Sequence, residues 1–182
     1  KDALTTNTTG ASNVAVGKGA LDANTTASSN TAVGVDALGA NTTGDANAAF
    51  GRTALSVNTT GQYNVAVGNG ALQENNANNN TAVGRYALFA NTTGDSNVAV
   101  GNNALDANTT GTGLVALGMG SLGSNTTASS NTAAGYNSLA NNTTGAYNSA
   151  FGNQALEANS TASNNTACGY KALEANTTGN SN

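Results

Sequence analysis

Hydrophobic and polar positions along the chain recur with a period of seventeen residues. In each unit an aliphatic or aromatic residue precedes a glycine, a leucine lies four residues after that glycine, and Asn, Thr and Ser fill most other positions. Residues 18–34 (KGALDANTTASSNTAVG) and 35–51 (VDALGANTTGDANAAFG) illustrate the unit. The glycine returns at Gly17, Gly34, Gly51, Gly68, Gly84, Gly101, Gly118, Gly135, Gly152 and Gly169, and only the step from Gly68 to Gly84 is sixteen residues. A fixed period of this kind indicates a repeat architecture.

The unit predicts a β-solenoid. Seventeen residues are too few for two packed helices, and the high content of Asn, Thr and Gly disfavours helix. Two short β-segments fit better, one at N-V-A-V-G (97–101) and one at A-L (104–105). The glycine permits a sharp bend, and Asn-Thr-Thr-Gly is suited to a turn. We therefore predict an all-β fold, a single parallel β-solenoid (β-roll) of about eleven 17-residue coils over residues 1–182, roughly 50 Å long.

Stacked coils place equivalent residues above one another, so that columns form. The residue before the glycine gives one aliphatic column and the leucine gives another, and we expect the two to face each other in a thin dry core. The predicted core residues are Val33, Phe50, Val67 and Val100 from the first column, and Leu21, Leu38 and Leu105 from the second.

A column of alanines alternates with the first aliphatic column. Because side chains alternate across a strand, these alanines are expected to point away from the core. Two explanations fit a small residue at every repeat: tight packing within the coil, or close packing of a second surface against this face. We favour the second, since it gives a strand buried on both sides and implies a homo-oligomer. The predicted oligomer face contains Ala32, Ala66, Ala99 and Ala133.

The asparagines of the N-T-T triplets form another column. Stacked amides can hydrogen-bond along the rod, as they do in other ladders of identical side chains. The same triplets match the acceptor pattern for N-linked glycosylation, which gives the column a second interpretation as a glycan-bearing or ligand-facing loop. We favour the ladder. The residues concerned are Asn24, Asn41, Asn58, Asn91, Asn108 and Asn142.

Composition and charge argue against several functional classes. Charged residues make up 8% of the chain, the net charge is −4, and His and Pro are absent. No basic surface is present for nucleic acid, and no stretch approaches the ~20 apolar residues that span a bilayer. Cys168 falls in the first aliphatic column, where we expect packing, and Asp45 and Asp95 lie three coils apart. We therefore predict no enzymatic activity, no cofactor, no metal site and no membrane span.

The iterated N-[TV]-A-[VF]-G core resembles the head repeats of YadA-like trimeric autotransporter adhesins, whose unit is close to N-S-V-A-I-G. The matching segments include 13–17, 30–34, 64–68 and 97–101. Similar repeats occur in phage tail-fibre and other bacterial surface proteins. The resemblance implies a left-handed roll, a trimer, display on a cell surface or virion, and binding to host matrix or glycan ligands. The seventeen-residue unit is longer than the family's common repeat.

These observations lead us to expect a non-enzymatic extracellular rod, structural or adhesive, in a bacterial surface adhesin or phage fibre. Both chain ends fall within the repeat without polar caps, so we also expect an uncapped fragment of a longer rod. One alternative is a self-assembling, glycosylated or bare, extracellular filament whose subunits stack end to end. Another is an ice-binding solenoid, although the adjacent Thr25 and Thr26 would point opposite ways in a strand.

Overall fold

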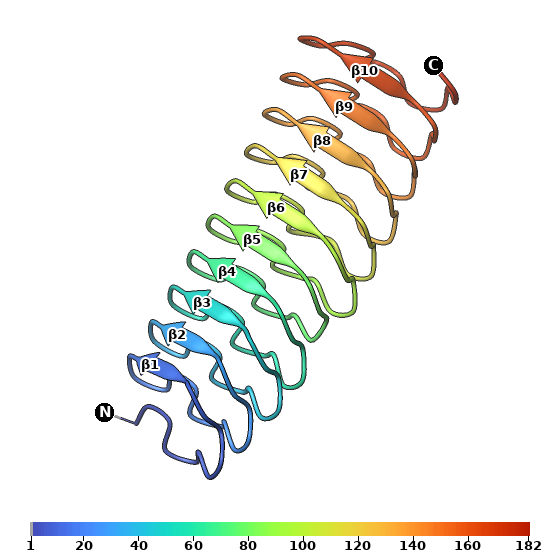
Figure 1. Ribbon diagram of the computed structural model, residues 1–182. Coiled ribbons are helices and arrows are strands. Elements are labelled where there is room, and N and C mark those ends of the chain that lie inside the picture. The colour runs from blue at the N-terminus through green and yellow to red at the C-terminus, as the bar shows by residue number, and fades with distance from the viewer. Residues whose placement is uncertain (1) are drawn as a thin grey trace.

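The computed structural model describes residues 2–182, so Lys1, where the predicted domain begins, lies outside the described residues. Ten three-residue strands follow one another along the rod, and the two termini lie at its opposite ends (Figure 1). The strands are β1 (Val14–Val16), β2 (Thr31–Val33), β3 (Ala48–Phe50), β4 (Val65–Val67), β5 (Thr81–Val83), β6 (Val98–Val100), β7 (Val115–Leu117), β8 (Thr132–Ala134), β9 (Ser149–Phe151) and β10 (Thr166–Cys168).

All ten strands form one parallel sheet in sequence order, with each residue paired to its equivalent in the next coil. Ala99, for example, pairs with Ala82 on one side and with Ala116 on the other. The sixteen-residue step is absorbed in the loop before β5, because β4 and β5 still pair in register. The predicted parallel β-solenoid with a 17-residue repeat is confirmed. The predicted count of eleven coils is wrong: the chain makes about nine turns, because the outermost segments carry no strand.

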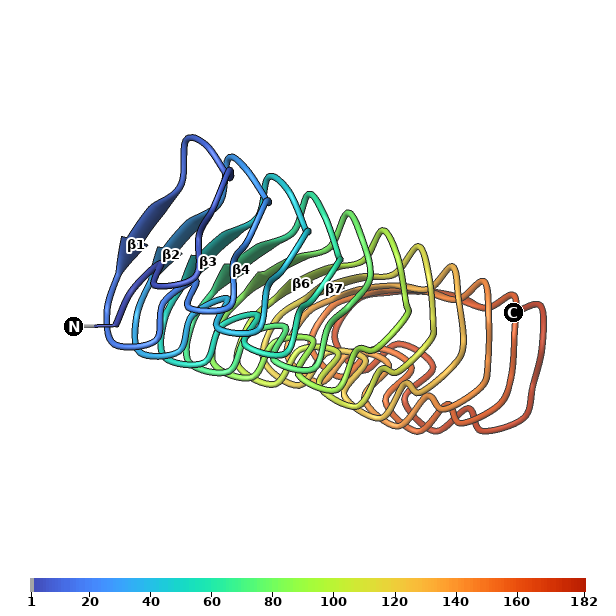
Figure 2. The ribbon, with the colours of Figure 1, turned by 90° about the horizontal axis from the view of Figure 1, so that it is seen from below.

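The interior is lined by leucine and alanine. Leu21, Leu38 and Leu105 are fully buried, as predicted. The middle residue of each strand from β2 to β10 is a buried alanine that belongs to the same core cluster as these leucines. The predicted oligomer face is therefore wrong, because its alanines are completely enclosed within the chain; they are Ala32, Ala66, Ala99 and Ala133. Figure 2 shows the coils stacked along the rod, and the strand alanines and the leucines pack in one core cluster inside them.

The residue before each glycine points outward, contrary to prediction. Phe50, Val67 and Val100 are 42%, 37% and 38% exposed, and Val33 is half-buried. Alternation along the strand holds, but its phase is the reverse of the one that hydrophobicity suggests. Along the strand, the small alanine takes the inward position beside the leucine column, and the larger side chains point outward.

The corners of the coil require a left-handed backbone at several non-glycine positions. Leu105 (φ 54), Asn103 (φ 54) and Ser96 (φ 60) represent three positions that recur in nearly every coil. The A-L segment is consequently a turn and not the second β-segment that we predicted, although Leu105 N–H still donates to the Ser121 carbonyl of the next coil. At the bend, Gly101 has φ 142, and an added Cβ would lie 2.5 Å from the Gly118 carbonyl oxygen. Only glycine fits there.

Candidate functional surfaces

The N-T-T asparagines form a buried ladder along the interior edge of the rod. Asn108 shows the pattern: its Nδ2 donates to Asn91 Oδ1 at 2.8 Å and to the Gly111 carbonyl at 3.1 Å. The predicted ladder is confirmed. The alternative that these residues face a glycan or ligand is wrong, because both amide hydrogens are used and the side chains are inaccessible. All six predicted loop residues are fully buried: Asn24, Asn41, Asn58, Asn91, Asn108 and Asn142.

A second asparagine column lies directly before the strands, at every strand except β7, and links neighbouring coils by hydrogen bonds. Asn97 Nδ2 donates to the Gly111 carbonyl at 2.9 Å, and its Oδ1 accepts the Leu114 N–H at 2.9 Å. Leu114 is itself a member of this column, and it offers no oxygen to the N–H of Asn131 in the next coil. The column was not among the sequence-based predictions, although an asparagine precedes nine of the ten strands and is plain in the repeat.

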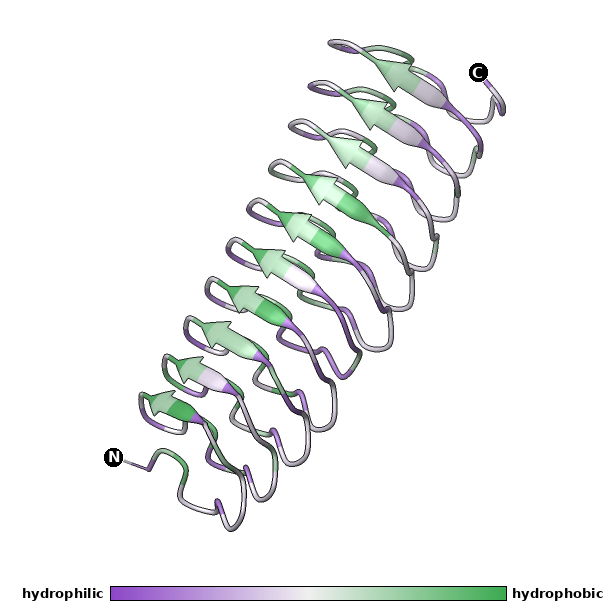
Figure 3. Ribbon diagram, in the orientation of Figure 1, coloured by the Kyte–Doolittle hydropathy of each residue, from purple (hydrophilic) through white to green (hydrophobic). Residues whose placement is uncertain are grey.

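The outward side of the sheet is a continuous uncharged strip, which we call the strand face. Its first row comprises Val14, Thr31, Ala48, Val65, Thr81, Val98, Val115, Thr132, Ser149 and Thr166, and its second row comprises Val16, Val33, Phe50, Val67, Val83, Val100, Leu117, Ala134, Phe151 and Cys168. None of these residues is buried. Figure 3 shows the mostly apolar colouring of the strands along the rod, with a hydrophilic asparagine before every strand except β7, which follows Leu114.

A small cleft, which we call the aromatic cleft, lies outside the strand face, between the turn segments of two neighbouring coils. Tyr86, Phe89, Asn103 and Asp106 line a volume of about 100 Å³. The two rings meet edge to face, with centroids 5.2 Å apart and an interplanar angle of 74°. The guanidinium carbon of Arg85 lies 4.3 Å from the centroid of the Tyr86 ring.

Asp106 is the carboxylate of the aromatic cleft. Asn103 Nδ2 donates to Asp106 Oδ2 at 2.8 Å and fixes its orientation. Burial raises the pKa of Asp106, and the hydrogen bonds from Asn103 and the local backbone oppose that rise. Among residues 2–182 the one ion pair joins Lys171 and Glu174, so no basic side chain pairs with Asp106.

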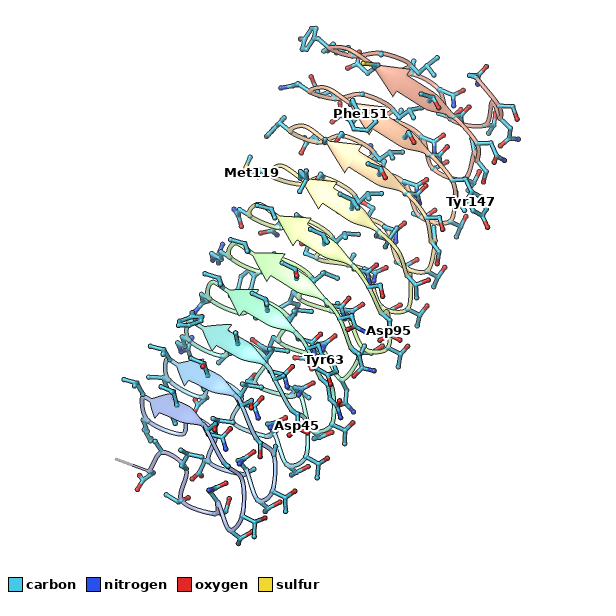
Figure 4. All side chains as sticks on the ribbon, in the orientation of Figure 1. Asp45, Tyr63, Asp95, Met119, Tyr147 and Phe151 are labelled. Atoms are coloured by element: carbon cyan, nitrogen blue, oxygen red, sulfur yellow. The ribbon has the colours of Figure 1, made fainter. Side chains whose placement is uncertain are left out.

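The remaining chemically active residues do not converge. Asp45 and Asp95 accept backbone N–H groups of Ser28 and Asn78 at 2.7 and 2.6 Å, and Figure 4 shows them along one edge of the sheet. Cys168 is exposed on the strand face, so its predicted role in packing is wrong. Within residues 2–182 no three His, Cys, Asp or Glu side chains could hold a metal ion.

The remaining findings concern membrane-spanning helices and similarity to known proteins. No helix formed by residues 2–182 has the length and apolarity required to cross a bilayer. Comparison of the chain with protein-family models, with curated proteins and with solved structures gives no match.

Proposed function

We propose that this chain is a non-enzymatic extracellular rod whose copies associate side by side through the strand face. The strand face carries the proposal: two outward positions on each of ten strands form a strip without a single charged residue. Nine strand spacings of ~4.8 Å and three residues of ~3.3 Å give a strip of about 43 by 10 Å, or about 430 Å². Exposed apolar patches of about 300–600 Å² often mark interaction sites.

A second copy of this chain is the partner that the strand face fits best. Two copies of a charged strip would repel each other. The strand face carries no charge, so two copies can pack together without this repulsion. Stiff parallel rods also present equivalent rows at the same spacing, which lets the rows mesh along their whole length. The resemblance to YadA-like heads favours three chains with left-handed coils, displayed on a cell surface or virion.

In such an assembly the loops opposite the strand face remain free. Each coil repeats the same turn, so a matrix or glycan ligand would meet many equivalent weak contacts, and multivalency would raise the overall avidity. The buried asparagine ladder leaves exposed Thr and Ser side chains to make these contacts. Tyr63 and Tyr147, which are 61% and 66% exposed, lie instead at the edge of the sheet, beside the start of β4 and β9 (Figure 4). Ice binding is not proposed, since only four of the twenty outward residues are threonine and the N-T-T threonines lie outside the strands.

Solution mass, measured by light scattering after gel filtration, tests the proposal. We expect three times the 17.6 kDa of one chain, and dissociation to monomer in Val100→Glu, which places a charge at the centre of the strand face. Val35→Arg is the matched control, because Val35 is 43% exposed away from the sheet and Arg52 and Arg85 occupy its position in other coils.

A monomeric unmodified chain, or an oligomer that survives Val100→Glu, would contradict side-by-side association. Long fibres of the pure chain in electron micrographs would instead favour the end-to-end filament. Circular dichroism of both variants confirms that the coil itself remains folded.

A further inference from the structure

The aromatic cleft exists because of a local departure from the repeat. Tyr86 and Phe89 precede Asn103 and Asp106 by seventeen residues each, so the two rings lie directly beside the two polar side chains in the next coil. On its other side Tyr86 has Gly70, where an added Cβ would lie 2.5 Å from Tyr86 Cδ1. The missing side chain at Gly70 leaves room for the Tyr86 ring to lie over that backbone. The cleft is the space that remains between the rings and the polar side chains of the next coil.

The chemical groups that line the cleft share one electrostatic character. Asp106 presents a carboxylate, Asn103 retains its amide oxygen because its Nδ2 is committed to Asp106, and the rings present π electrons. Arg85 already places its guanidinium over the Tyr86 ring, so this ring attracts a cation in the chain itself. The lining therefore favours a ligand that is positively charged, donates hydrogen bonds and carries apolar carbon.

Asp106 is the group that this ligand would satisfy. The carboxylate is half-buried, burial raises its pKa, and among residues 2–182 it forms no ion pair. A partly desolvated carboxylate is stabilised by an adjacent cation. A cation between this carboxylate and two aromatic rings gains from both, because ring faces attract ammonium groups most strongly when water is partly excluded.

We propose that the aromatic cleft binds an alkylammonium group, with the nitrogen beside Asp106 and its carbon substituents against Tyr86 and Phe89. Asn103 acts as a positioning residue that holds the carboxylate. A lysine side chain of another protein and a quaternary ammonium headgroup share this chemistry. The inference does not depend on the strand face, since the cleft lies on a different side of the coil.

Titration with n-butylammonium chloride and tetramethylammonium chloride, followed by ring ¹³C and side-chain amide shifts in NMR spectra, tests the proposal at constant ionic strength. We expect saturable shifts at Tyr86, Phe89 and Asn103, with a dissociation constant on the order of 1–10 mM for a single small cation. Tighter binding of the primary amine would indicate a lysine source, and tighter binding of the quaternary ion would indicate a headgroup. Binding should weaken as the pH is lowered enough to protonate Asp106.

Three variants separate the cleft from general surface effects. Asp106→Asn keeps the shape and removes the charge, and it should weaken binding about tenfold or more. Gly70→Asn keeps a residue that tolerates a left-handed backbone but pushes the Tyr86 ring into the cleft, and it should abolish saturation. Glu157→Gln is the matched control. Gln154 and Glu157 occupy the positions of Asn103 and Asp106 in another coil, and Gln154 Nε2 donates to Glu157 at 2.7 Å. Asn137 and Ala140 stand there in place of the two rings, so this substitution should leave binding unchanged.

Three results would overturn the inference: no saturable shift below 50 mM, which is about fivefold above the expected range; equal weakening by Glu157→Gln; or preferential binding of methyl glucoside over both ammonium ions. Circular dichroism and the dispersion of the remaining amide signals establish that each variant keeps its coils, so a loss of binding cannot be attributed to unfolding.

Discussion

The second asparagine column should carry a large share of coil-to-coil stability, and Asn97→Ala tests this directly. The substitution removes the acceptor of the Leu114 N–H and one of two donors to the Gly111 carbonyl, which keeps its bond from Asn108. Asn97 and Leu114 are both fully buried, so water cannot replace the lost acceptor.

The magnitude follows from one orphaned amide and one small cavity. An unsatisfied buried donor costs about 1–3 kcal/mol, and the loss of packing around the shortened side chain adds about 1 kcal/mol. The free energy of unfolding should therefore fall by about 2–4 kcal/mol. If the coil opens locally, 2 kcal/mol corresponds to roughly 30-fold faster hydrogen exchange at the Leu114 amide.

Urea unfolding monitored by circular dichroism measures the global effect, and hydrogen exchange monitored by NMR measures the local one. Thr93→Ala is the control, because Thr93 is exposed and lies in the same coil; its effect should stay within about 0.5 kcal/mol. A loss below about 0.5 kcal/mol in Asn97→Ala, or an unchanged exchange rate at Leu114, would refute the proposed role of the column.

Three further predictions follow from the backbone and the charges. Gly101→Ala should cost more than about 3 kcal/mol in urea unfolding, because its Cβ would meet the Gly118 carbonyl at 2.5 Å and its backbone is strained for any other residue. Thr53→Asn should raise stability by about 0.5–1 kcal/mol in the same assay, because Thr53 has φ 54 and other coils place Asn103 and Asn137 there. Burial raises the pKa of Asp106 in the folded chain, so protonation of this carboxyl favours the folded state. The contribution of Asp106 to the free energy of unfolding should therefore rise as the pH falls below neutral. Asp106→Asn should remove this part of the pH dependence of the urea midpoint.

Much of the fold is predictable because each repeat shows both the seventeen-residue period and the glycine, asparagine and threonine residues that favour turns. The leucine column and the amide ladder follow from the seventeen-residue spacing, and both are found where predicted. The phase of the strand is not predictable from hydrophobicity. Ala99 lies inside with the leucine column and Val100 lies outside, and the path of the coil between them and the leucine includes the left-handed corners at Asn103 and Leu105. Asparagine at position 103 is compatible with one of these corners, but Leu105 does not indicate the other, since leucine rarely adopts a left-handed backbone.

The aromatic cleft lies between these extremes. The seventeen-residue offset between Phe89 and Asp106 is visible in the sequence and predicts that they are neighbours. The cleft itself depends on Gly70, one coil earlier, and on how far the Tyr86 ring leans over it, which requires coordinates. The repeat makes the shared residues conspicuous, whereas this cleft is formed by residues that occur in only one pair of neighbouring coils.

The in-register parallel pairing has a mechanical consequence. Backbone hydrogen bonds between coils run along the rod, and each coil is held mainly by the coil on either side of it. A pull on one end therefore detaches the outermost coil first, because that coil pairs with only one neighbour. Each coil that detaches releases seventeen residues, or about 55–60 Å of extended chain. A tether built this way lengthens in uniform steps under tension, dissipating force without releasing its far end.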